Sequence, residues 1–174
     1  MNINNLYKID SRDKVFIDTN ILIFLFSPSF VNSHRYQVDK YSAVFSLLVE
    51  NKCVLYINSH VISEFINRCL RIDFDNNFNS EKNKNYKKDY RNSAEYLKTI
   101  QIVLKQLKKF LKLAKHINDD FESFDITNAY NTTKESDFND LIIADTVRSN
   151  NLKLFSDDRD FQNNLGIDTD WYLR

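Results

Sequence analysis

Glycine is almost absent from this chain, because Gly166 is the single glycine among 174 residues. Phosphate-binding turns need glycine, since only a residue without a Cβ lets the backbone approach a phosphate closely. Walker A loops and dinucleotide-binding turns are therefore excluded, and with only one proline so are collagen-like and Pro/Gly-rich sequences. Hydrophobic residues make up 43% of the chain, which excludes a disordered protein and suits a single domain over residues 1–174.

Short apolar runs alternate with segments of helical periodicity. Strands are predicted at Lys14–Ile17, Cys53–Ile57, Leu152–Phe155 and, in the tail, Ile167–Tyr172. Helices are predicted between them, ending at Phe26 and covering about 40–50, 60–72, 93–117 and 136–149. This alternation favours an α/β protein with a central parallel sheet and helices on both faces.

The middle of the chain differs from the rest in charge. Residues 81–115 hold eleven Lys and Arg against three acids, whereas residues 118–170 hold thirteen acids against four bases. This asymmetry predicts a basic and an acidic face, which a net charge of zero conceals. Residues 73–92 are polar and read as a loop, and the following long helix carries an apolar stripe at Leu97, Ile100, Leu104, Leu107, Leu111 and Ala114. That stripe is expected to be core or a helix-hairpin seam.

Two features bear on the compartment. Cys53 and Cys69 lie in apolar surroundings without metal-ligand spacing, as in a reducing cytoplasm. The N-terminus lacks a signal-peptide layout, and the longest apolar stretch, Val15–Phe26, is interrupted by polar residues. The prediction is a cytoplasmic protein without membrane segments.

Acidic residues follow each predicted strand. Asp18 ends the first, Glu64 lies one turn into the helix after the second, and Asp140 opens the helix at 136; Asp157, Asp158 and Asp160 follow the third. Because the carboxyl ends of parallel strands share one edge, these carboxylates are expected to converge there. Each acid alone also suits helix capping or a turn, although Glu64 lies beyond the capping positions.

A cluster of carboxylates is costly without a cation, and Mg²⁺ or Mn²⁺ prefers such oxygen ligands. A metal held there can activate water and stabilise a leaving oxygen, as phosphodiester hydrolysis requires. Zinc chemistry and Ser-His-Asp catalysis find no support, because His60 is the one histidine near these acids.

Four ordered motifs resemble the PIN-domain ribonucleases, which include the toxin nucleases of bacterial toxin–antitoxin pairs. They are Val15 to Asn20 (VFIDTN), Ile62 to Phe65 (ISEF), Asn139 to Ala144 (NDLIIA) and Leu154 to Phe161 (LFSDDRDF). The resemblance covers nearly the whole chain apart from its middle.

The resemblance implies a three-layer α/β/α sandwich with a parallel sheet of four or five strands and a metal-dependent endoribonuclease site. Asp18, Glu64 and Asp140 would be the core ligands of Mg²⁺ or Mn²⁺, with Asp158 as fourth acid and Asp160 next. The family's supporting hydrogen-bonding positions match Thr19, Asn20 and Ser156. An RNA substrate, an antitoxin and a homodimer are the implied partners.

The chain departs from the compact toxins in its middle, since Glu64 and Asp140 are 76 positions apart. The elaboration at about 73–118 contains Lys84, Lys87, Lys88 and Arg91, interleaved with Tyr86 and Tyr90. Cations bind phosphates and tyrosines stack on unpaired bases, so an RNA-binding arm is one reading. A hairpin for dimerisation or for holding an antitoxin is another.

Three competing functions remain. A phosphatase with Asp18 as nucleophile requires a second acid two residues later, and Asn20 at that position disfavours this function. A primase-like metal site requires glycines that the chain lacks. A catalytically weak or inactive PIN-like scaffold that binds RNA or a protein is the main alternative to the ribonuclease.

Overall fold

A four-stranded parallel sheet organises the part of the chain that the structure, a computed structural model, describes: residues 7–28, 34–79, 83–119, 124–127 and 136–173. Its strands are β1 (Lys14–Ile17), β2 (Val54–Ile57), β3 (Ala114–His116) and β4 (Lys153–Phe155), in the spatial order β3-β2-β1-β4. All neighbouring pairs are parallel, and β1 lies between β2 and β4. All four carboxyl ends therefore lie at one edge of the sheet.

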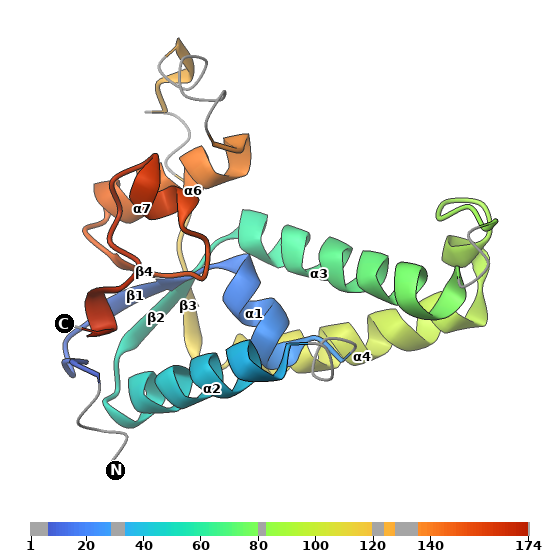
Figure 1. The fold of residues 1–174 in the computed structure, drawn as a ribbon, viewed down its shortest axis with the longest axis horizontal. Coiled ribbons are helices and arrows are strands. Elements are labelled where there is room, and N and C mark those ends of the chain that lie inside the picture. Colours follow the sequence, from blue (N-terminus) through green and yellow to red (C-terminus); the bar gives the residue numbers. More distant parts are fainter. Residues whose placement is uncertain (1–6, 29–33, 80–82, 120–123, 128–135, 174) are drawn as a thin grey trace.

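Helices cover both faces of this sheet (Figure 1). Helix α1 (Thr19–Phe26) contacts α2 (Arg35–Glu50), α3 (Ser59–Asp73) and α4 (Ala94–Phe110), and these four lie on one side. The other side carries α6 (Phe138–Ser149) and the short α7 (Asp160–Asn163). The predicted α/β/α architecture is thereby confirmed. Within the described ranges no helix is long and apolar enough to cross a membrane.

The main core lies between the sheet and its helices because the strands are apolar on both faces. Val15, Phe16 and Ile17 of β1 are 0% exposed. The apolar sides of α1 and α6 close the two faces over them. This packing fixes the position of the residue that follows each strand, which is where the predicted acids lie.

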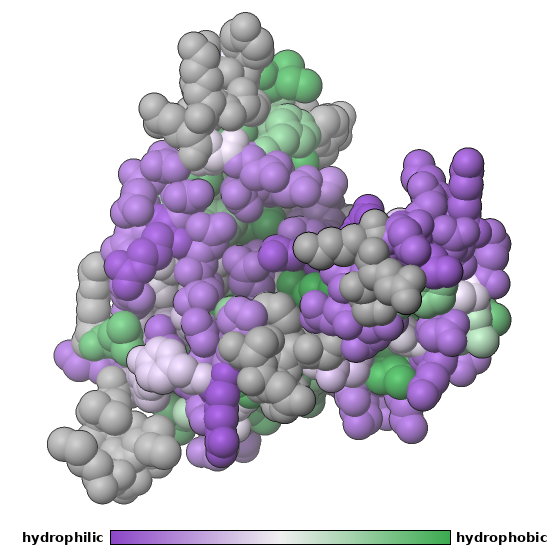
Figure 2. All heavy atoms as spheres, turned by 45° about the vertical axis from the view of Figure 1, so that its right-hand side comes forward, coloured by the Kyte–Doolittle hydropathy of each residue, from purple (hydrophilic) through white to green (hydrophobic). Residues whose placement is uncertain are grey.

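Helices α3 and α4 form an arm that extends beyond the sheet (Figure 1). At its far end α3 continues as a π-helical turn (Phe74–Phe78), and a 3₁₀ turn (Tyr90–Asn92) leads into α4. Leu70, Phe74 and Tyr90 form a small buried cluster there, separate from the main core. The predicted loop at 73–92 is therefore largely folded among its described residues. The surface of this side is mostly hydrophilic (Figure 2).

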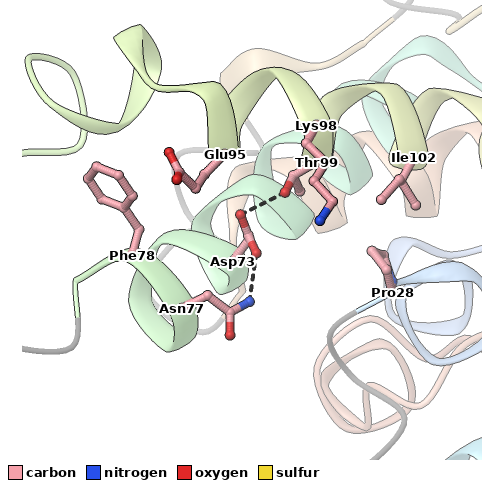
Figure 3. A pocket seen from close by; sticks show the side chains of 8 residues that line it. All are labelled: Pro28, Asp73, Asn77, Phe78, Glu95, Lys98, Thr99 and Ile102. Carbon is pink, nitrogen blue, oxygen red and sulfur yellow. Dashed lines mark hydrogen bonds between the residues drawn. The ribbon is translucent and has the colours of Figure 1, made fainter.

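A buried carboxylate braces the arm. Asp73, 7% exposed, accepts hydrogen bonds from the hydroxyls of Tyr90 (2.6 Å) and Thr99 (2.8 Å) and from the Asn77 amide (2.7 Å). Asp73, Asn77 and Thr99 line a cavity of about 350 Å³ that Phe78 also borders (Figure 3). Because Asp73 is the last residue of α3 and its partners come from the two turns and α4, it holds both helices of the arm together.

The long predicted helix was too long. It ends at Phe110, and residues 114–116 pair instead with β2 as the edge strand β3. The reason is that backbone hydrogen bonds to β2 outweigh the helical propensity of this Leu- and Lys-rich sequence. The predicted stripe is also shifted, because α4 buries Thr99, Val103, Leu107 and Phe110 while Leu97 and Leu104 are 59% and 46% exposed.

The predicted C-terminal strand at 167–172 was wrong. The tail forms a 3₁₀ turn, Trp171–Leu173, whose side chains pack against the sheet. The Trp171 indole N–H donates to the carbonyl of Leu154 (2.8 Å), and the Tyr172 ring contacts the ring of Phe155. Aromatic burial, and not strand pairing, therefore explains the apolar pattern of the tail.

Candidate active site at the carboxyl edge of the sheet

Asp18 lies at the centre of the carboxyl edge, where β1 gives way to α1. Its backbone N–H still donates to Phe155 of β4 (3.1 Å), while its side chain caps α1. One carboxylate oxygen accepts from the Thr19 N–H (2.6 Å) and the other from the Ser156 hydroxyl (2.7 Å). The side chain is 4% exposed, so Asp18 is held in one orientation by two strands and a helix.

Glu64 reaches the same place from α3. The Thr19 hydroxyl donates a 2.9 Å hydrogen bond to Oε2 of Glu64, while Oε1 pairs with Arg68 at 3.4 Å. Arg68 also donates to the side chain of Asn20 (3.1 Å). Thr19 and Asn20, both predicted supporting residues, therefore contact the Glu64–Arg68 pair. Capping does not account for Glu64, since Asn58 caps α3.

Three acids follow β4, and the structure separates them. The Asp157 carboxylate accepts a hydrogen bond from the Tyr41 hydroxyl of α2. The Asp158 N–H donates to the Ser156 hydroxyl (3.0 Å), and Asp158 in turn accepts from the N–H of Asp160 (2.9 Å) at the start of α7. Ser156 thus connects Asp158 to Asp18, whereas Asp160 is exposed and lies one step further out.

Asp140 lies in the first turn of α6, on the opposite face of the sheet from α3. The cap of that helix is Asp137, whose side chain accepts from the N–H of Asn139 (3.2 Å). Asp140 is therefore not needed as the cap, and its partly buried side chain is left for another role.

The acids act on one another electrostatically. Burial raises the pKa of Asp18 from 3.8 to about 6; hydrogen bonds from Ser156 and Thr19 oppose this, and the charges of Glu64 and Asp158 add to it. Burial likewise raises the pKa of Asp140 from 3.8 to about 7, with the charges of Asp18 and Asp158 next in importance and Glu64 contributing too. Four acids from four elements therefore share one electrostatic environment.

The donor set suits a hard divalent cation, because it consists of carboxylates whose charged forms are disfavoured by burial and mutual repulsion. Among the residues described, no three His, Cys, Asp or Glu side chains are arranged as a ready-made metal-holding group.

The family model of the PIN domain matches residues 15–164. The chain belongs to the PIN domain family. A chain in the crystal structure of VapBC2 from Rickettsia felis bound to a DNA fragment from their promoter has a similar fold, with a TM-score of 0.51 and 19% identity over 89% of this chain and 93% of that one. No curated protein matches the sequence.

PIN domains are generally nucleases, and the match spans Asp18, Glu64, Asp140, Asp158 and Asp160. It also spans the arm, and the single domain over 1–174 stays a prediction. The acids of this PIN domain come from the ends of β1 and β4 and the starts of α3 and α6.

The predicted RNA-binding residues lie at the far end of the arm. Lys84, Lys87, Lys88 and Arg91 are all exposed, while Lys82 is outside the described residues. The predicted stacking role of the two tyrosines was wrong for Tyr90, which is 0% exposed. Tyr86 is partly buried, with its ring edge-on to Phe74 and 4.0 Å from the Arg71 guanidinium. Both rings stabilise the arm, and its exposed surface offers cations instead.

Two polar residues at this edge were not singled out from the sequence. Arg68 lies four residues after Glu64, a spacing that places both on one helix face and so offered a signal. Asp119 follows β3, a strand that the sequence did not reveal, and its carboxylate accepts from the side chains of Asn58 and Ser59.

Proposed function

We propose that this PIN domain is a divalent-metal-dependent endoribonuclease that hydrolyses RNA phosphodiester bonds at Asp18, Glu64, Asp140 and Asp158. The observation that carries the proposal is the convergence of Asp18, Glu64 and Asp158 at one edge through hydrogen bonds of Thr19 and Ser156. The raised pKa of Asp18 and Asp140, to which the other acids contribute, supports it. Structural capping alone gives no reason for four acids to share one environment.

In this proposal Mg²⁺ or Mn²⁺ binds between the four carboxylates, with Asp160 as an outer ligand. The bound ion supplies activation of water and stabilisation of the developing charge on oxygen. The chain's own part is to hold the carboxylates in place, so no side chain is needed as a nucleophile.

The supporting residues set the orientation of these carboxylates. Ser156 donates to Asp18 and keeps one of its oxygens fixed, while the Thr19 hydroxyl does the same for Glu64. Asn20 holds Arg68 beside Glu64. Arg68 is 50% exposed, so its charge is available both to Glu64 and to an incoming phosphate.

RNA is the proposed substrate, and the exposed cations at the far end of the arm support this choice. Lys84, Lys87, Lys88 and Arg91 would bind phosphates, a contact that tolerates any base sequence. Helix α3 runs from Glu64 to its end at Asp73 over about 14 Å along the helix axis, and the π-helical turn extends the arm further. The far end of the arm is therefore within reach of an RNA strand bound at the carboxylates.

A toxin role is also proposed. The VapBC2 structure contains a toxin–antitoxin pair with promoter DNA, and its fold is similar to this one. We extend this to an antitoxin protein as partner, to a homodimer and to action in the cytoplasm. Purification of the chain with the product of a neighbouring small gene would test the antitoxin, and light scattering of the chain alone would test the homodimer.

The deciding experiment is RNA cleavage with Mg²⁺ or Mn²⁺ by the purified full chain, the Asp18→Asn variant and the matched control Asp75→Asn, whose acid is exposed on the π-helical turn. Cleavage should need the metal, be lost in Asp18→Asn and persist in Asp75→Asn. Equal cleavage by all three would overturn the site. RNA binding without cleavage by the unaltered chain would favour the scaffold.

A further inference from the structure

A second cavity opens at the carboxyl edge of the sheet, beside the acids. It has a volume of about 520 Å³ and lies where β2 and β3 end. Its apolar lining is Ile57, Ile62 and Ile117, and its polar lining is Asn58, Ser59, His116, Asn118 and Asp119. None of these residues belongs to the proposed catalytic set.

The strand register places this cavity next to Asp18. Phe16 pairs with Tyr56, so Ile17 lies across from Ile57, and Ile57 pairs with His116. Asp18 and Asn58 therefore follow adjacent strands, and Ile117 follows the next one. Neighbouring strands are about 5 Å apart, which puts the cavity roughly 5 to 10 Å from Asp18.

The polar side of the cavity is organised around the Asp119 carboxylate. The Asn58 amide donates to one oxygen, and the Ser59 hydroxyl (3.3 Å) and the His60 ring (3.5 Å) approach the other. The Asp119 side chain is 14% exposed. An ionised carboxylate has about four acceptor positions, so the hydrogen bonds from Asn58 and Ser59 fix its orientation and leave acceptor positions for a ligand.

We infer that this cavity binds an unpaired nucleobase next to the scissile phosphate and prefers a base with an exocyclic amino group, such as cytosine, over uracil. The inference rests on the proposed ribonuclease function, because it takes the acids as the site of cleavage. The flat face of a nucleobase can pack against the side chains of the three isoleucines. Its polar edge can form hydrogen bonds with the polar wall of the cavity.

The carboxylate decides which bases fit. Asp119 repels a phosphate, so the backbone of the RNA is excluded from this cavity. It accepts a hydrogen bond from the amino group of cytosine, a pairing that carboxylates make with this base. Uracil presents a carbonyl oxygen at the same position, which would leave two acceptors facing each other without a proton.

The test uses short RNAs that are identical except for cytosine or uracil at each position flanking the cleaved bond. At one position kcat/KM should favour cytosine by at least about fivefold. Asp119→Asn should bring this preference within about twofold or reverse it, because an amide can donate to uracil. Asp39→Asn, an exposed acid on α2, is the matched control and should keep the preference.

A binding measurement makes the inference independent of catalysis and of the variant's folding. Cytidine and uridine are titrated onto the unaltered chain with labelled isoleucine methyl groups, and methyl NMR is recorded. Cytidine should shift the methyls of Ile62 and Ile117 more than uridine does. Such methyl shifts without any RNA cleavage would support base binding in the cavity and contradict the proposed nuclease function. RNA cleavage with neither a base preference nor methyl shifts would contradict base binding in the cavity and leave the nuclease function standing.

Discussion

The Thr19 hydroxyl lies 2.9 Å from Oε2 of Glu64 and donates a hydrogen bond that joins the start of α1 to α3. Its neighbour Asp18 is fixed by the backbone N–H of the same threonine. One residue therefore orients two of the four acids, which come from separate elements of the fold.

Replacing Thr19 by Val keeps the shape of the side chain and removes this donor. Glu64 then loses its orienting hydrogen bond, and the affinity for Mn²⁺ should fall about 10- to 100-fold. The measurement is a Mn²⁺ titration followed by thermal unfolding. Thr19→Ser keeps the hydroxyl and should bind as the unaltered chain does; a Thr19→Val affinity equal to it would show that Glu64 needs no such support.

Asp18→Asn should stabilise the metal-free protein at neutral pH. An unfolded Asp18 titrates near 3.8 and the folded one near 6, so the folded state binds the extra proton between these values. The stability that Asp18 contributes through this proton is therefore fully present below pH 3.8 and is lost as the pH rises through about 6. Asn carries no charge at any of these pH values, so the free energy of unfolding of Asp18→Asn at pH 8 should exceed that of the unaltered chain by on the order of 2 kcal/mol.

Urea unfolding with a chelator, at pH 8 and near pH 4, checks this expectation. The gain of Asp18→Asn should shrink at the lower pH, where Asp18 is protonated in the unaltered chain. A gain of the same size at both values would mean that packing, and not charge, causes it.

Charge reversal of Lys84, Lys87 and Lys88 to Glu should weaken RNA binding and flatten its dependence on salt, because fewer counterions are released from the RNA. Anisotropy of a labelled RNA over a range of salt concentrations measures both. The matched control reverses Lys105, Lys108 and Lys109, equally exposed cations of α4 outside the arm's far end. Equal effects of the two triple variants would mean that net charge alone is responsible.

Tyr90→Phe should lower the free energy of unfolding by about 1–3 kcal/mol. The ring stays packed, but the buried Asp73 carboxylate loses its 2.6 Å donor and keeps only Thr99 and Asn77. Chemical denaturation measures the loss. Tyr36→Phe, at a tyrosine 77% exposed, is the control and should change little.

Two leucines one turn apart on α4 test its packing register. Leu107 is 5% exposed and Leu104 is 46% exposed. Leu107→Ala should therefore cost about 2–5 kcal/mol of stability, whereas Leu104→Ala should cost about 0.5 kcal/mol or less. Equal costs in denaturant unfolding would show that the stripe predicted from the sequence faces the core after all.

The sequence predicted the central strands and the helices that follow them because each buried strand is an apolar run bounded by polar cap residues. It failed at β3, whose three residues Ala114, Lys115 and His116 are at most partly buried at the sheet edge. Such a strand is defined by its hydrogen bonds to β2, which leave no hydrophobic pattern to read. Asp119, which follows β3 by three positions, was missed for the same reason.

The acids were predictable because strand ends dictate their positions, whereas their hydrogen bonds depend on tertiary contacts. Thr19 and Glu64, for example, are 45 positions apart, and only the packing of α1 on α3 reveals that they touch. The stacking role of Tyr90 was predicted wrongly because an isolated aromatic residue in a polar segment suits stacking on RNA as well as a small local core.

That small core at the end of the arm, built on Leu70, Phe74 and Tyr90, is closed without help from the sheet. Ile66 of α3 packs against both this cluster and the main core, so length changes in α3 and α4 that keep this contact would preserve both. Under the proposed ribonuclease function, relatives of this protein with shorter or longer arms would keep the carboxylate site and differ in how far from it the cations of the arm contact the RNA.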